Sequence, residues 1–299
     1  MVCRAVIFTD LDGTLLDGET YSFEAARSAL KELKRRQVPV VLCTSKTRVE
    51  TETVARKLGL KHPFIVENGG AIFIPPGYFT PEQLTSAGIR PKRRGNYVVL
   101  ELGLPYQQLR RFLINFRKKY KVPVKGFGDC QPEEIARITG LSRREARLAR
   151  RREYDEPCWL EDTAGVKLFR QKAREAGLKV VRGGRFFHLT GNNDKGRAVR
   201  LLKKLYRRKF GQIMTVGLGD AANDWPMLKE VEVPVLVARQ DGQTAGLKKL
   251  SGKIYKTRKA GPAGWAEAIE NWLKSDRIGR AFDKFEEPSL CSSSGSRWK

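Results

Sequence analysis

Short apolar runs alternate with amphipathic segments at the start of this chain, and this alternation restricts the fold more than any other feature of the sequence. The apolar runs 2–9, 38–44 and 64–67 predict buried strands, and the segments 23–36 and 47–58 between them predict helices. Buried strands that are connected by helices form a parallel sheet with helices on its faces. The sequence therefore predicts an α/β fold.

The alternation is interrupted in the middle of the chain and returns after it. Residues 85–186 predict mainly helices, several of them basic, whereas strands are again expected at 213–218 and 233–237. This pattern predicts a second, α+β domain inserted into the first. The Ser/Gly-rich carboxyl end predicts a disordered tail. The expected units are the first part of the core, the inserted domain, the second part of the core and the tail: 1–84, 85–186, 187–275 and 276–299.

The chain is strongly basic, and the excess is concentrated in the inserted segment. There are 58 Lys and Arg residues against 33 Asp and Glu residues, a net charge of +25. Residues 86–186 hold 25 basic and 11 acidic residues, a net of 25 − 11 = +14. Arginines at the spacing of 143, 144, 147, 150, 151 and 152 favour a solvated helix face. A nucleic-acid-binding surface is the alternative, and it is not favoured.

The sequence argues against a membrane or secreted protein. No apolar run approaches the roughly 20 residues of a membrane-spanning helix, and Asp10 and Asp12 interrupt the first apolar run. The five cysteines are widely spaced and include no CxxC pair, which predicts reduced thiols rather than a disulfide framework or a zinc site. We therefore expect a cytoplasmic location. The oligomeric state is not predicted.

Two carboxylates follow the first apolar run directly. Asp10 and Asp12 alternate with Leu11, so in extended chain both point to the same side, at the end of a strand where α/β sheets bind ligands. Two carboxylates next to a buried strand are costly unless a cation joins them. A simple turn at Asp12-Gly13 is an equally good interpretation of these residues alone.

A second acidic cluster follows the predicted strand 213–218. Asp220 and Asp224 are separated by four residues, so both can face one cation from a forming helical turn. Helix capping by Asp220 or Asn223 is the alternative, but it accounts for only one carboxylate. Together the two clusters suit Mg²⁺, which takes oxygen ligands and also holds a phosphate oxygen.

Two further groups fit a phosphate. Thr44 and Ser45 end the predicted strand 38–44, where a hydroxyl can donate to a phosphoryl oxygen, although either residue can instead cap the next helix. Lys195 stands at a predicted helix start, where backbone amides and an ammonium favour an anion. The alternative for Lys195 is an ordinary surface lysine.

The order of these groups resembles a known superfamily. DLDGT at 10–14, a Thr/Ser at the second strand end, a helix-opening Lys and GDAAND at 219–224 are similar to the four motifs of the haloacid dehalogenase-like (HAD) phosphatases. The insertion between the second and third motifs resembles the sugar-phosphate phosphatases. TSKTR, ENGGAI, REYDEP and RFFHLTGNNDKG resemble segments of the mannosyl-3-phosphoglycerate phosphatase family. The resemblance implies a HAD-type Rossmann-like core with an inserted α+β cap.

The resemblance also implies a mechanism. Asp10 would be the nucleophile that forms an aspartyl phosphate, and Asp12 would be the acid and then the base. Asp10, the Asp12 carbonyl and Asp220 would bind Mg²⁺ with help from Asp224, while Lys195 and Thr44 would stabilise the phosphoryl oxygens. The predicted substrate-binding residues come from the core and from the cap: Ser45, Lys46, Arg48, Asn68, Gly69, Arg152 and Asn223.

The implied reaction is the hydrolysis of the small phosphosugar mannosyl-3-phosphoglycerate to mannosylglycerate, a compatible solute, and phosphate. The alternatives within the superfamily are glucosyl-3-phosphoglycerate and sucrose phosphate, and the alternative of another class is a basic nucleic-acid-binding protein. Tyr154, Asp155 and Glu156, in the REYDEP segment, are further candidates for contact with the substrate. His188 is expected to be a strand or core residue rather than a ligand.

Overall fold

A five-stranded sheet forms the centre of the larger lobe. The computed structural model describes residues 4–183, 185–240 and 254–278. The sheet has the order β13-β12-β11-β1-β2, and every pairing in it is parallel. The predicted α/β fold is thereby confirmed. The strands are β1 (Arg4–Thr9), β2 (Val40–Leu42), β11 (Ile213–Gly219), β12 (Val233–Ala238) and β13 (Tyr255–Ala260).

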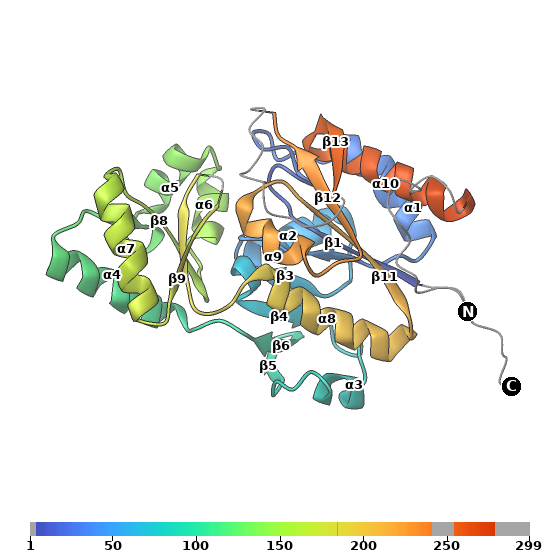
Figure 1. The fold of residues 1–299 in the computed structure, drawn as a ribbon, viewed down its shortest axis with the longest axis horizontal. Helices are drawn as coiled ribbons and strands as arrows, with labels where there is room; N and C mark the ends of the chain where they lie inside the picture. Colours follow the sequence, from blue (N-terminus) through green and yellow to red (C-terminus); the bar gives the residue numbers. More distant parts are fainter. Residues whose placement is uncertain (1–3, 184, 241–253, 279–299) are drawn as a thin grey trace, which may run out of the picture.

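Helices cover both faces of this sheet (Figure 1). Helix α1 (Arg27–Arg35) and helix α10 (Gly261–Ile278) bury apolar side chains in a cluster on one face, and α8 (Lys195–Phe210) and α9 (Trp225–Leu228) do so on the other. Each Leu, Ile or Phe side chain removed from water contributes about 1.5–3 kcal/mol, so these two clusters supply most of the driving force for the core. Helix α2 (Arg48–Leu58) follows β2. None of the helices within the described ranges is long and apolar enough to cross a membrane.

A second, antiparallel sheet extends the core lobe. It has the order β3-β4-β6-β5 and is joined to the parallel sheet through a bridge between Cys43 and Ile65. Its turn from β3 to β4 contains ENGG, in which Glu67 and Asn68 both have positive φ. The elements are β3 (Phe64–Val66), β4 (Ala71–Ile74), α3 (Pro81–Thr85), β5 (Lys92–Arg94) and β6 (Tyr97–Glu101).

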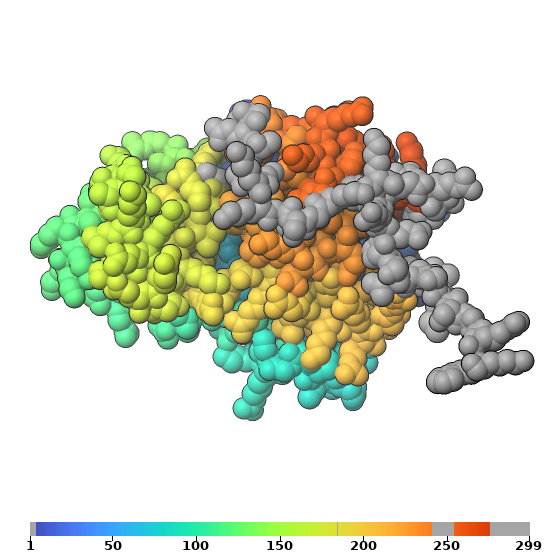
Figure 2. All heavy atoms as spheres, in the orientation of Figure 1, coloured from blue at the N-terminus to red at the C-terminus, as the bar shows by residue number. Residues whose placement is uncertain are grey.

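The smaller lobe is the cap, a four-stranded sheet that has helices packed on it. The strands are antiparallel in the order β7-β8-β10-β9, and α4 and α7 pack their apolar faces on one side of them. Figure 2 shows the cap and the core as two lobes side by side, with atoms of the amino-terminal part visible between them. The elements are β7 (Lys125–Gly126), β8 (Asp155–Trp159), β9 (Lys179–Arg182), β10 (Phe187–Thr190), α4 (Tyr106–Tyr120), α5 (Pro132–Thr139), α6 (Arg143–Ala149) and α7 (Thr163–Glu175).

The sheet pairings differ from the domain limits expected at 85 and 186. Strand β6 pairs with β4 on the core side, and β10 lies between β8 and β9 inside the cap sheet. Both strands are short apolar runs whose partners are distant in sequence, so local pattern could not assign them to a lobe. On these pairings we propose 104–190 as the cap. Helix α10 reaches Ile278, and the expected tail beyond it lies outside the described residues.

The basic helix α6 has the solvated face that its spacing predicts. Five arginines of this region, at positions 143, 144, 147, 150 and 151, are exposed, while Ala146 and Ala149 are buried beneath them. Arg152 is the exception. Its side chain turns inward and donates to the carbonyl of Ser45 in the core. The arginine run therefore divides into a solvated face and one residue directed at the seam between cap and core.

Candidate active site

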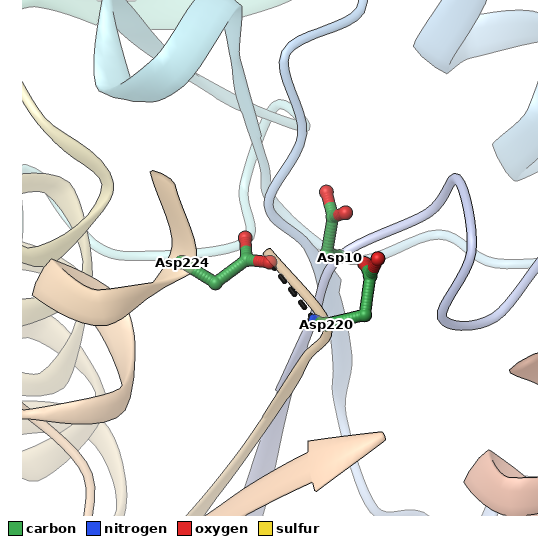
Figure 3. A group of neighbouring side chains, drawn as sticks. All are labelled: Asp10, Asp220 and Asp224. Carbon is green, nitrogen blue, oxygen red and sulfur yellow. Dashed lines mark hydrogen bonds between the residues drawn. The ribbon is translucent and has the colours of Figure 1, made fainter. Parts of the chain in front are cut away.

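The two acidic clusters of the sequence meet at one edge of the parallel sheet. Asp10 follows β1 and Asp220 follows β11, and these strands are parallel neighbours. The Asp10 amide donates to the Leu218 carbonyl at 2.9 Å, which extends the pairing up to the carboxylates. Carboxylate oxygens of Asp10, Asp220 and Asp224 lie within 4.8 Å of one another (Figure 3). The structure thus brings together three of the four aspartates expected at the metal, and Asp12 is not in this group.

Asp224 is positioned by the loop that begins after β11. Its Oδ2 accepts hydrogen bonds from the amides of Asp220, at 3.1 Å, and Ala221, at 3.0 Å. Gly219 allows this fold-back, because a Cβ at that position would lie only 2.5 Å from the Asp224 Cβ. Asp224 therefore accepts from the loop amides itself, a role that the alternative interpretation of the sequence gave to Asp220 or Asn223.

Lys195 joins the two clusters. The fully buried ammonium lies 2.7 Å from Asp10 Oδ1 and 2.6 Å from Asp224 Oδ1. Burial by itself would lower the pKa of Lys195, but the two carboxylates outweigh this effect and raise the pKa above its usual value. The side chain thus remains a cation at neutral pH. The alternative of an ordinary surface lysine is wrong.

The carboxylates outnumber the cations that face them. Burial, followed by the charge of Asp224, raises the pKa of Asp10 well above its usual value and that of Asp220 to about 7. Arg239 partly offsets the negative charge of Asp220, because its Nη1 lies 3.1 Å from Asp220 Oδ2. A buried site with oxygen ligands and an excess of negative charge has the composition that Mg²⁺ selects. The residues present therefore fit the predicted metal.

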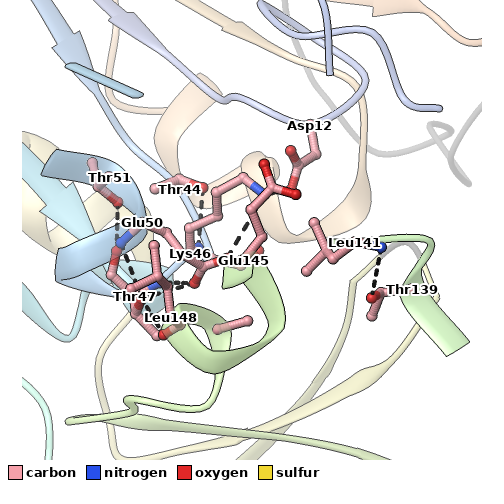
Figure 4. Close-up of polar contacts among 12 residues, drawn as sticks. Asp12, Thr44, Lys46, Thr47, Glu50, Thr51, Thr139, Leu141, Glu145 and Leu148 are labelled. Atoms are coloured by element: carbon pink, nitrogen blue, oxygen red, sulfur yellow. Dashed lines mark hydrogen bonds and ion pairs between the residues drawn. The ribbon is translucent and has the colours of Figure 1, made fainter. Parts of the chain in front are cut away.

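Asp12 faces a different cation. Its Oδ2 lies 2.9 Å from Lys46 Nζ, and Figure 4 shows Lys46 reaching toward it from the start of α2. Burial would lower the pKa of Lys46, but Asp12 and Glu50 raise it above its usual value. Asp12 Oδ1 is buried without a hydrogen-bond partner among the described residues. One oxygen of Asp12 is therefore fixed and the other is available to a ligand.

Thr44 and Ser45 occupy different positions beside the carboxylates. Thr44 is buried, its amide donates to the Ile65 carbonyl, and its Oγ1 accepts from the Lys46 amide at 3.1 Å. Ser45 lines the cavity that opens in front of the aspartates. The structure thus gives Thr44 a supporting place in the loop and puts Ser45 at the wall.

A cavity of about 470 Å³ lies between the aspartates and the cap. Asp10, Asp12 and Asp220 line its core side together with the predicted residues Ser45, Lys46 and Asn223. Arg152 reaches it from the cap and crosses the seam with a 2.7 Å hydrogen bond to the Ser45 carbonyl. The cavity is therefore bounded by catalytic-type carboxylates on one side and by cap residues on the other.

Three predicted substrate-binding residues are not at the cavity wall. Arg48 pairs with Glu52 and Glu153 and lines a separate cavity. Asn68 is buried, and its side chain is bonded to other protein groups. Gly69 allows the close approach of the Asp194 backbone, because a Cβ at position 69 would come within 2.1 Å of the Asp194 carbonyl oxygen. The three share motifs with site residues, but sequence proximity does not reveal which way a side chain points.

Several residues of the wall were not among the predicted site residues. Arg185 and His188 line the cavity from the cap, and Tyr21 and Glu50 line it from the core. His188 is a buried strand residue, as expected. It also lines the cavity, so its burial does not prevent it from contacting a ligand. Arg185 and His188 lie in RFFHLTGNNDKG, so that segment contained a signal for them.

Comparison with known proteins agrees with this geometry. Residues 7–86 match the family model of the haloacid dehalogenase-like hydrolases. A protein of Methanococcoides burtonii named glucosyl-3-phosphoglycerate/mannosyl-3-phosphoglycerate phosphatase is 46% identical over 89% of this chain and 96% of its own length. Mannosyl-3-phosphoglycerate phosphatase of Pyrococcus furiosus is 39% identical over 78% of this chain and 90% of its own length.

A solved structure has the same architecture. The crystal structure of Thermoplasma acidophilum 0175 superposes with a TM-score of 0.65 at 18% identity and covers 91% of this chain and 99% of that one. A likeness at this identity shows a shared fold, in which a core sheet carries a cap. The chain belongs to the haloacid dehalogenase-like superfamily, and within it the protein is a phosphoric monoester hydrolase.

Proposed function

We propose that the protein hydrolyses mannosyl-3-phosphoglycerate to mannosylglycerate and phosphate. The observation that carries this proposal is the buried Asp10 carboxylate, held 2.7 Å from Lys195 at the floor of a cavity that the cap completes. The substrate has a phosphate, a carboxylate and sugar hydroxyls. The relative from Pyrococcus furiosus that bears the name of this activity matches most of the chain.

In the first step Asp10 acts as the nucleophile. Lys195 occupies Oδ1, so Oδ2 is the oxygen that attacks phosphorus. The new O–P bond forms as the bond from phosphorus to the C3 oxygen of the glycerate breaks, and Asp12 donates a proton to that leaving oxygen. The place of Asp12 in the cavity wall, fixed through Oδ2 by Lys46, supports this role.

In the second step the aspartyl phosphate is hydrolysed. Asp12 takes a proton from a water molecule as the water oxygen attacks phosphorus, and the bond from phosphorus to Asp10 breaks. Phosphate leaves and the Asp10 carboxylate is restored. Lys195 stays protonated throughout, because its buried carboxylate partners raise its pKa, and its charge stabilises the phosphoryl oxygens.

Mg²⁺ would be held by Asp10 and Asp220 with support from Asp224. When bound, it supplies positive charge that offsets the mutual repulsion of the Asp10 carboxylate and the phosphate. The raised pKa values of Asp10 and Asp220, caused first by burial and then by Asp224, support this assignment. Thr14 donates to Asp220 Oδ1 at 2.9 Å and fixes that carboxylate at the site.

The glycerate carboxylate would meet the cations of the wall. Lys46 comes from the core, and Arg152 and Arg185 come from the cap. Arg152 is anchored by the carbonyls of Ala149 and Ser45, at 2.8 and 2.7 Å, so its guanidinium is held in a fixed orientation. A rigid guanidinium suits a planar carboxylate.

Glucosyl-3-phosphoglycerate is a second candidate substrate. The relative from Methanococcoides burtonii, at 46% identity, is named for both glycosides. The two substrates share the phosphate, the glycerate and the leaving oxygen, so the same catalytic groups would serve both. Only the sugar differs.

The test is phosphate release from a panel of substrates. We expect mannosyl-3-phosphoglycerate to have the highest kcat/KM, glucosyl-3-phosphoglycerate to be hydrolysed as well, and sucrose phosphate to react slowly. EDTA should abolish activity and excess Mg²⁺ should restore it. Hydrolysis of p-nitrophenyl phosphate without hydrolysis of either glycoside would contradict the proposed substrate, and full activity in EDTA would contradict the metal.

A further inference from the structure

A buried chain of polar side chains connects the cap sheet to the metal-site loop. His188 on β10 lies with Nδ1 2.8 Å from Asp155 Oδ2 on β8. Asn68 Nδ2 donates to the same oxygen at 2.8 Å, and Asn223 Nδ2 donates to Asn68 Oδ1 at 3.1 Å. The four side chains are at least nine-tenths buried, and Asp155 is fully so. Four segments that are distant in sequence therefore share one hydrogen-bond network.

Asp155 sets the direction of every hydrogen bond in this network. The Asp155 carboxylate accepts from the Asn68 NH₂ and faces His188 Nδ1, so Nδ1 is assigned as the donor to it. Asn68 then has only its oxygen left for Asn223, which must offer its own NH₂ in turn. With Nδ1 turned to Asp155, the His188 ring presents Nε2 to the cavity, and Asn223 is left with Oδ1.

Both ends of the network face the cavity. His188 and Asn223 line it. Asn223 Oδ1 is buried without a partner among the described residues, and the side-chain contacts of His188 with Asp155 are made by Nδ1. Gly183 keeps the imidazole accessible, because a Cβ there would lie 2.7 Å from Nε2. Asn223 Oδ1 is a buried acceptor without a partner, which is costly, so a ligand that donates a hydrogen bond is favoured there. His188 faces the same cavity and can contact the same ligand.

From this network we infer that His188 and Asn223 recognise hydroxyl groups of the substrate sugar, with His188 as a specificity-determining residue. Sugar hydroxyls can donate as well as accept, whereas ionised phosphate and carboxylate groups can only accept and suit the cations Lys46, Arg152 and Arg185. The cationic residues would thus hold the phosphate and carboxylate end of the substrate, and His188 and Asn223 would hold its sugar end. Asp155 and Asn68 act as positioning residues. This inference rests on the proposed function, since it assigns the sugar end of that substrate.

The test compares two substrates that differ only in the sugar, mannosyl-3-phosphoglycerate and 3-phosphoglycerate. His188→Asn keeps an NH₂ in the place of Nδ1 for Asp155 and removes the acceptor at Nε2, whereas His188→Ala removes both. His62→Asn is the matched control, because His62 bonds Tyr78 and lines a different cavity.

We expect His188→Asn to lower kcat/KM for the glycoside about tenfold, mainly through KM, and to leave 3-phosphoglycerate hydrolysis unchanged. His62→Asn should change neither. An equal loss on both substrates, or no loss on the glycoside, would overturn the role of His188. A wild-type enzyme that hydrolyses p-nitrophenyl phosphate but no glycoside would overturn the proposed function, and the inference with it.

A second measurement is independent of turnover. The sequence has two histidines, so ¹⁵N spectra of the untagged protein contain two imidazole spin systems, which the His62→Asn variant assigns. We expect the His188 imidazole to carry a proton on Nδ1 and none on Nε2. We also expect the Nε2 resonance to shift on addition of mannosylglycerate. A neutral ring protonated at Nε2, or an Nε2 resonance that does not respond to mannosylglycerate, would contradict the acceptor role even if a variant failed to fold.

Discussion

Neutralising Asp220 is expected to stabilise the metal-free protein while it abolishes catalysis. Burial and the Asp224 carboxylate raise the pKa of Asp220 from 3.8 to about 7. Between these values the folded protein keeps a proton that the unfolded chain has lost, so the free energy of unfolding falls as pH rises through this window. The resulting penalty on the wild type is between about 1 and 2 kcal/mol at pH 5 and about 4 kcal/mol at pH 8.

Asp220→Asn removes this penalty and keeps an oxygen that can accept from Thr14. The measurement is urea unfolding followed by circular dichroism in EDTA, at pH 5 and pH 8, for the wild type, Asp220→Asn and the exposed control Glu270→Gln. We expect the variant to exceed the wild type by about 4 kcal/mol at pH 8 and by less at pH 5, and the control to show no gain. A variant that is equal to or less stable than the wild type at pH 8 would refute the reasoning.

Four further outcomes follow from the same geometry. Asp10→Asn should reduce phosphate release to background with an unchanged circular dichroism spectrum, and a rate near that of the wild type would exclude Asp10 as the nucleophile. Lys195→Met should lower kcat by about 10²–10³-fold and destabilise the metal-free protein by about 3–5 kcal/mol, since it strands two buried carboxylates; kinetics and urea unfolding measure the two effects. Arg48→Ala should leave kcat/KM unchanged, because Arg48 lines a separate cavity, and a large loss would show that it reaches the substrate. Leu202→Ala, on the buried face of α8, should cost about 2–5 kcal/mol in unfolding free energy. At temperatures below the unfolding transition it should leave kcat unchanged.

The sequence predicted which side chains meet at the edge of the parallel sheet, because these residues belong to local patterns. Asp10 and Asp220 each follow an apolar strand, and parallel strands end at the same edge of a sheet, so their convergence follows from the alternation of strands and helices. Lys195 was recognisable from its place at a helix start. For these residues a short stretch of sequence predicts both the secondary-structure element and the direction in which the side chain points.

The cap and the substrate wall were less predictable for a physical reason. Strands β6 and β10 are short apolar runs, and only pairing with distant strands assigns them to the core sheet and the cap sheet. Asn68 and Arg48 lie close in sequence to residues of the site, yet one is bonded to Asp155 and the other to Glu153. These partners are more than eighty residues away along the chain.

The sequence by itself determined the parallel core, the order of the proposed catalytic groups along the chain and their places at the ends of strands and the start of a helix. Tertiary structure alone decided which side chains share the cavity, how Asp155 orients His188, and where the core ends and the cap begins. The physical reason is that periodicity and motif spacing act over a few residues. A cavity wall is instead formed by side chains from segments that meet only after the chain has folded.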